Sequence, residues 1–256
     1  MRQILLIMTI ASTIILTSCA TSSTQKKELT NTERARLLVD VSNGALLEGD
    51  PTGALQNLAQ AEQLDPSLPE LHHSKALAYF AKHDLKTAIT EARRAVTLAP
   101  GFTDANNTLG KLLLDDGRYE EAEPPLLQAA NNPLYRDAYK ANTNLGILFY
   151  RKGEYGKAKA TLERAIEEAP ASACIAHYYL GHIQLRNGAL EKSLQEYEHA
   201  TLKFCAKFGD AHLAVGMLFE RNKEYDRARK KYLDIKQSFP NTKIAEQAME
   251  RLKYLP

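Results

Sequence analysis

One small residue returns along the chain at a nearly constant spacing, and this repeat limits the fold more than any other feature. The first series has spacings of 34, 34, 36, 35 and 35 residues and comprises Ala54, Ala88, Ala122, Ala158, Ser193 and Ala228. A second series follows seven residues later in every unit and comprises Ala61, Ala95, Ala129, Ala165, Ala200 and Ile235. Positions seven apart share one face of a helix, so the same helix face recurs six times. Such a period predicts a stack of helical repeats rather than a generic helical bundle.

Each unit also carries the signals of two helices joined by a tight turn. One dipeptide in each unit ends in a small residue, which lets the two helices approach closely. These dipeptides are Val41-Ser42, Lys75-Ala76, Leu109-Gly110, Leu145-Gly146, Leu180-Gly181 and Val215-Gly216. Glycine, which supplies the positive φ that ends a helix, follows at Glu48-Gly49-Asp50, Asp116-Gly117, Lys152-Gly153 and Asn187-Gly188. Prolines, which stop helices, mark the unit ends at Pro66, Pro100, Pro133, Pro170 and Pro240. Only Cys205 breaks that series.

The combination resembles the tetratricopeptide repeat, and residues 144–170, NLGILFYRKGEYGKAKATLERAIEEAP, match its pattern nearly position by position. The resemblance implies an all-α fold, a right-handed α-solenoid of about six repeats over residues 33–256. The repeats are expected at about 35–68, 69–102, 103–138, 139–173, 174–208 and 209–240. A capping helix is expected over 241–254, because Asn241-Thr242 is a capping signal. Its apolar face would comprise Ile244, Ala248, Met249 and Leu252.

The first eighteen residues have the pattern of a secretory signal peptide. One positive charge at Arg2 precedes an uncharged run over 4–16, which is too short to cross a bilayer core of about 30 Å. The tetrad 16–19, LTSC, resembles the bacterial lipobox, so Cys19 is expected to carry diacylglycerol and to begin the mature chain. Ala20 rather than Asp follows it, which implies the outer membrane of a Gram-negative cell, on the periplasmic side. The alternative is an ordinary cleaved signal with an incidental cysteine.

The polar segment 19–32 is expected to be a flexible tether. Lipid chains contribute about 0.8 kcal/mol per buried methylene, so the anchor alone can hold the protein at the membrane. The whole sequence has 33 Lys and Arg against 31 Asp and Glu, a net charge of +2 that gives no electrostatic argument for nucleic acid. We therefore expect protein partners, with no small-molecule substrate and no nucleic acid.

The first helix of each repeat is expected to line the inner groove of the stack. Residues at fixed positions of these helices predict a largely apolar floor made of Leu77, Phe80, Leu114, Ile147, Tyr150, Tyr178, Leu213 and Met217. Such a floor suits an amphipathic helix or an extended peptide. For each residue singly, packing between adjacent helices is the alternative. Four basic residues are expected either on a solvated face or at the edge of the groove: Lys111, Arg151, Arg186 and Arg221.

No residue pattern points to catalysis or to a cofactor. Cys174 and Cys205 lie about one repeat apart, and in an oxidising compartment adjacent loops could bring them within disulfide distance. The spacing leaves open whether they form a bridge. Neither belongs to a CxxC pair, and His177 and His182 are five residues apart, so no metal-ligand set is predicted. The chain has no phosphate loop, no HExxH and no GxSxG, and we expect a protein that is not an enzyme.

The junction between the third and fourth repeats departs from the pattern. Glu123-Pro124-Pro125 is expected to interrupt and kink a helix. Residues 133–135, PLY, lead to 144–146, NLG, and together they resemble the type IV pilus biogenesis lipoproteins of the PilF, PilW and Tgl family over residues 1 to about 240. The resemblance implies a pilotin, which helps the secretin ring to reach and assemble in the outer membrane. The alternative is an adaptor that recruits peptidoglycan hydrolases or synthases, since it would need the same anchor and groove.

Overall fold

The computed structural model describes residues 28–256, so the expected signal peptide and Cys19 lie outside the described residues. Over that range the chain is all-helical, without a strand. The α-helices are α1 (Asn31–Leu47), α2 (Pro51–Leu64), α3 (Pro69–Ala81), α4 (Leu85–Leu98), α5 (Thr103–Asp115), α6 (Tyr119–Ala130), α7 (Ala138–Arg151), α8 (Tyr155–Glu168), α9 (Cys174–Arg186), α10 (Leu190–His199), α11 (Gly209–Arg221), α12 (Tyr225–Ser238) and α13 (Lys243–Lys253). A short 3₁₀ helix, η1 (Lys203–Cys205), lies between α10 and α11.

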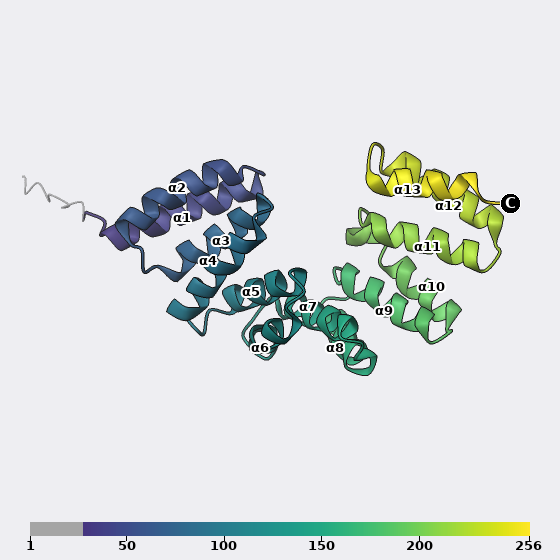
Figure 1. Cartoon of the computed structure of the whole chain (residues 1–256), viewed down its shortest axis with the longest axis horizontal. Helices are drawn as coiled ribbons and strands as arrows, with labels where there is room; N and C mark the ends of the chain where they lie inside the picture. The colour runs from purple at the N-terminus through teal and green to yellow at the C-terminus, as the bar shows by residue number, and fades with distance from the viewer. Residues whose placement is uncertain (1–27) are drawn as a thin grey trace, which may run out of the picture.

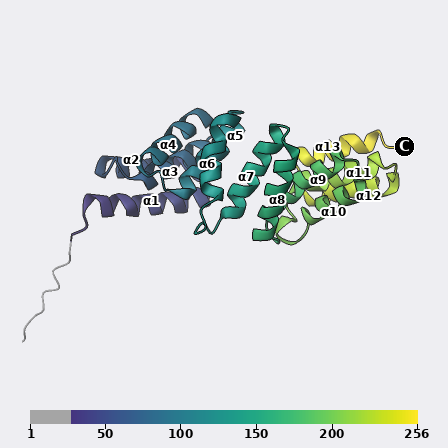
Figure 2. The same ribbon diagram turned by 90° about the horizontal axis from the view of Figure 1, so that it is seen from below.

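The helices pack as six consecutive antiparallel pairs, from α1 with α2 to α11 with α12, and α13 packs on the last pair. The pairs follow a curve in which the first and last pairs rise on either side of the middle ones (Figure 1). Figure 2, turned by 90°, shows the same pairs side by side along the long axis. Contacts between next-nearest helices join α1 with α3, α3 with α5, α5 with α7, α7 with α9 and α11 with α13. The odd-numbered helices therefore form the inner side of the curve, and the predicted all-α solenoid is confirmed.

The two sequence series form the seams of this stack. Every alanine of both series is fully buried, as is Ser193, and Ile235 is 1% exposed. Small side chains at these positions let helices approach closely enough for dispersion contacts along their whole length. The burial extends across the repeats, because one cluster of apolar side chains runs from Ala76 on α3 to Ile183 on α9. Each pair thus hides its apolar face against its neighbours, as a repeat architecture requires.

Both ends of the stack carry helix caps. At the first, the Thr30 hydroxyl accepts from the Glu33 amide, and the Glu33 carboxylate accepts from the Thr30 amide, which is a capping box. Helix α1 thus begins at Asn31, inside the segment expected to be a tether. At the other end, Thr242 caps α13, whose Ile244 and Leu252 pack against the last pair. Within residues 28–256 no helix is both long and apolar enough to cross a membrane.

Helix α6 corrects the expectation for the paired prolines. It runs without a break from Tyr119 to Ala130, through Pro124 and Pro125. The two rings remove the amide donors that would bond the carbonyls of Glu120 and Glu121. Both glutamates are exposed, so water can bond these carbonyls instead. The helix is therefore not interrupted.

Candidate partner-binding groove

Two neighbouring pockets lie along the inner side of the curve. The first, of about 390 Å³, lies between α9, α11 and α13, and the second, of about 660 Å³, lies between α5, α7 and α9. Tyr178 and Asp210 line both, so the pockets adjoin. We call this surface, from Lys111 on α5 to Arg251 on α13, the inner groove.

Aromatic side chains meet in the middle of the inner groove, with Tyr178 at their centre. Its ring centroid lies 4.5 Å from that of His182, 5.2 Å from Phe208 and 5.6 Å from Tyr179, each in an edge-to-face arrangement. Burial, with the negative charge of Asp210, raises the pKa of Tyr178 to about 12. The phenol is therefore neutral at physiological pH. Rings locked against one another offer a rigid surface that needs little ordering when a partner binds.

Gly181 on α9 leaves room for an aromatic side chain from α10, the outer helix of the same pair. A Cβ added to Gly181 on α9 would lie 2.5 Å from Cε1 of Tyr197, so the Tyr197 ring fills the space that a side chain would take. Tyr197 belongs to α10, yet its hydroxyl lies 2.9 Å from Nδ1 of His182 on the groove side. Burial, and then the charge of Arg151, lower the pKa of His182, so its ring is neutral at pH 7.

The last repeat has the same arrangement of a glycine on the inner helix and a tyrosine on the outer helix. Gly216 leaves room for Tyr232, whose hydroxyl donates to Oε2 of Glu220 at 2.7 Å. Arg251 of α13 donates to the same oxygen at 3.1 Å. The carboxylate in the first pocket is thus fixed by two donors, one from α12 and one from α13.

Charges of both signs surround the apolar floor. Arg151 and Arg221 line the second and the first pocket, respectively, and Asp210 lines both. Lys111 pairs with Asp115 at 2.6 Å. Arg186 lies outside both pockets, with its guanidinium 4.3 Å from the ring centroid of Tyr155. A partner segment would therefore meet apolar contacts in the centre and exchangeable ion pairs at the rim.

The structure distributes the predicted floor residues unevenly. Tyr178, Leu213 and Met217 line the first pocket, and Leu114 and Ile147 line the second. Leu114 is only 8% exposed, so it serves the core more than the groove.

The other three predicted floor residues line neither pocket. The ring centroid of Tyr150 lies 5.2 Å from that of Tyr179. Leu77 and Phe80 are exposed on α3 but line neither pocket, and the Lys111 ammonium lies 4.4 Å from the Phe80 ring centroid. Sequence reasoning missed Tyr197, Phe208 and Arg251, because they belong to an outer helix, a connection and the cap. The Gly181 to Tyr197 spacing of 16, repeated from Gly216 to Tyr232, is the signal that could have found Tyr197.

The connection that carries Phe208 is tied to the groove helix. Cys174, the first residue of α9, is joined by a disulfide to Cys205 in η1, with 5.4 Å between their Cα atoms. Cys205 stands where the other repeats end in proline. The bond holds the segment before α11 against the start of α9, next to Ile175 and Phe208, which both line the second pocket.

Comparisons with known proteins agree with this architecture. A family model described as tetratricopeptide repeat matches residues 73–139 and 143–207, and a second model of the same description matches 210–242. The type IV pilus assembly protein PilF of Pseudomonas aeruginosa is 28% identical over 154 residues, which are 59% of this chain and 61% of that protein. The chain thus spans about three-fifths of the length of this relative.

Two solved structures have the same fold. A structure of Pseudomonas aeruginosa PilF superposes with a TM-score of 0.71 and 20% identity, over 86% of this chain and 99% of that one. A structure of PilW, described as a widely conserved type IV pilus biogenesis factor, gives a TM-score of 0.73 and 19% identity, over 84% and 98%. At such identities the likeness shows the fold alone.

Proposed function

The chain belongs to the tetratricopeptide repeat family, and on that premise we propose that it is a non-catalytic scaffold at the outer membrane, a pilotin that helps the secretin of a type IV pilus to reach its place and assemble. The likeness to PilF in sequence and to PilF and PilW in fold relates the chain to type IV pilus biogenesis factors. The observation that carries the proposal is the inner groove, with its rigid aromatic centre between two adjoining pockets.

The inner groove suits a segment that is apolar on one side. Burying one aliphatic or aromatic side chain contributes roughly 1.5 to 3 kcal/mol, so two or three anchors contribute about 3 to 9 kcal/mol before the losses of association. Binding of this strength is reversible, as required of a factor that must release a subunit into a ring. The oriented groups at the rim, Glu220 above all, would select the direction of the bound segment.

In this proposal the N-terminus supplies the membrane location. Cys19 would carry the acyl chains, and the stack would face the periplasm while the groove remains free for its partner. Replacing Cys19 by Ser removes the acceptor thiol, so the protein should leave the outer-membrane fraction, as immunoblots of separated membranes would reveal. Unchanged fractionation of the variant would contradict the anchor but leave the groove unaffected.

The groove is tested by one substitution and its matched control. Met217 on α11 and Leu233 on α12 are both exposed apolar residues, at 38% and 48%, but only Met217 lines a pocket. In a strain that lacks the native gene, Met217→Asp should lower the amount of heat-resistant secretin multimer and of surface pili, because a carboxylate in the apolar floor opposes burial. Leu233→Asp should restore both.

Two outcomes would contradict the proposal, one its groove and the other its pilotin function. Normal multimers with Met217→Asp, at wild-type protein levels, would place the partner surface elsewhere. If deletion of the gene itself leaves secretin multimers unchanged, the pilotin function is wrong. Recovery of peptidoglycan hydrolases or synthases on the wild-type groove would then favour an adaptor.

A further inference from the structure

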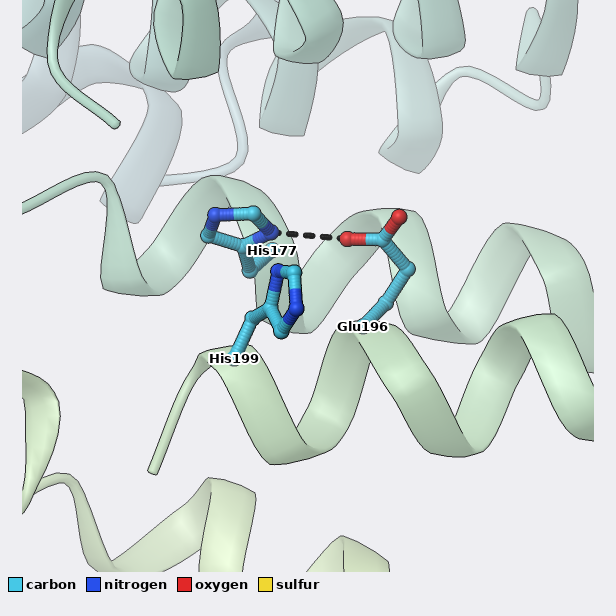
Figure 3. A group of neighbouring side chains, drawn as sticks. All are labelled: His177, Glu196 and His199. Atoms are coloured by element: carbon cyan, nitrogen blue, oxygen red, sulfur yellow. Dashed lines mark hydrogen bonds and ion pairs between the residues drawn. The ribbon is translucent and has the colours of Figure 1, made fainter. Parts of the chain in front are cut away.

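Three potential metal ligands meet on the fifth repeat, away from the residues that line the inner groove. His177 lies on α9, and Glu196 and His199 lie one turn apart on α10 (Figure 3). Nδ1 of His177 is 2.7 Å from Oε2 of Glu196, and the two imidazole centroids are 5.1 Å apart. Ligand atoms of all three side chains lie within 4.8 Å of one another. The sequence predicted no such set, because the residues come from two helices.

The second repeat shows what this position does when it serves packing alone. His72 occupies the place of His177, and its Nδ1 is likewise 2.7 Å from a carboxylate nineteen residues on, that of Glu91. Its Nε2, however, lies 2.9 Å from the carbonyl oxygen of Pro66 and 3.1 Å from Nε of Arg94. Both ring nitrogens are therefore occupied, and a guanidinium, which repels cations, stands beside them.

The fifth repeat differs from the second in both respects. Within residues 28–256, no hydrogen bond is formed by Nε2 of His177, although its side chain is only 8% exposed. Twenty-two residues after His177, where the second repeat has Arg94, the chain has His199. A guanidinium, which repels cations, is thus replaced by an imidazole, whose nitrogen lone pair can bind a metal ion, and the carboxyl group of Glu196 is retained.

We propose that His177, Glu196 and His199 bind one divalent transition-metal ion, Zn²⁺ by the chemistry of the set, and that the ion joins α9 to α10. Imidazole and carboxylate suit Zn²⁺, whereas Ca²⁺ and Mg²⁺ prefer oxygen ligands alone. Tetrahedral bonds of about 2.0 to 2.2 Å place neighbouring ligand atoms roughly 3.3 Å apart. The ligand atoms of the three side chains all lie within 4.8 Å of one another, so small side-chain rotations bring them to that spacing. His199 is exposed, so its ring can turn toward the ion.

The test compares full chains in detergent, stripped of metal and titrated with Zn²⁺ by calorimetry. Wild type should bind one equivalent saturably, and Co²⁺ should produce the visible absorption of a low-symmetry site. His199→Arg, which copies the second repeat, and Glu196→Gln should each weaken binding at least about tenfold. His72→Asn is the control, because Asn106 and Asn142 occupy its position in the third and fourth repeats.

The comparison isolates the site from every other donor. Ligands elsewhere in the protein are the same in all four chains, and circular dichroism shows whether each chain is folded. Wild type without a saturable one-equivalent site would overturn the proposal. So would equal affinity of His199→Arg and wild type, or an equal loss in His72→Asn.

Discussion

The close approach of α9 and α10 at Gly181 makes a quantitative prediction. In Gly181→Ala the new Cβ would meet Cε1, Cδ1 and Cγ of Tyr197 at 2.5, 2.6 and 3.2 Å. Tyr197 is 1% exposed, so a shift of its ring would disturb the side chains packed around it. Overpacking of this kind costs about 1 to 3 kcal/mol, against which alanine regains about 1 kcal/mol of helix propensity.

Gly44→Ala on α1 is the matched control, because a Cβ there meets nothing within 4 Å. It should raise the free energy of unfolding by about 0.5 to 1 kcal/mol. Gly181→Ala should therefore lie about 1 to 3 kcal/mol below Gly44→Ala in urea unfolding followed by circular dichroism. Equal stability of the two variants would refute the reasoning.

A double variant separates this overlap from other effects. Tyr197→Ala alone should lose about 3 to 5 kcal/mol through the cavity that it leaves. In that background Gly181→Ala should become neutral or stabilising, because the pair then copies Ala76 and Ala92 of the second repeat. A cost of Gly181→Ala that stays the same in both backgrounds would exclude Tyr197 as its cause.

Two further predictions concern the same half of the molecule. Cys174 and Cys205 are 31 residues apart, and replacing both by Ser should lower the free energy of unfolding in urea by about 3 to 4 kcal/mol relative to oxidised wild type. A variant as stable as oxidised wild type would contradict this prediction. Because burial lowers the pKa of His182 in the folded state, its contribution to stability is present above the unfolded pKa of about 6.5 and is lost as the pH falls below it. His182→Gln should therefore lose less stability than wild type between pH 7 and pH 5, and an identical pH dependence of the two would be the contrary result.

The repeat could be predicted from sequence because its signals are local. Alanines seven apart must share a helix face, and glycines at a fixed place in each unit permit close packing, so the six pairs follow from spacing alone. The interruption expected at the paired prolines was wrong because a proline removes one donor but does not decide whether water reaches the carbonyl it leaves. Solvent exposure of Glu120 and Glu121 decides that, and it depends on the packing of neighbouring repeats.

The groove could be predicted only in outline, for a related reason. Leu114 and Ile147 both line the second pocket, yet the curve of the stack buries Leu114 and leaves Ile147 half-buried. Tyr197 reaches the inner side from an outer helix, which no count along the inner helices can anticipate. The proposed metal ligands His177, Glu196 and His199 come from two helices, so their approach depends on how α9 packs on α10 rather than on spacing along the chain.

The central claim is that the partner binds the inner groove, and site-specific photocrosslinking in living cells tests it most directly. A photoreactive amino acid at position 217 lies in the first pocket, and one at position 233 lies on the outer helix α12. In cells that are assembling pili, position 217 should form an adduct with the secretin and position 233 should not. Adducts from position 233 alone, or none from position 217 while secretin multimers form, would contradict the account.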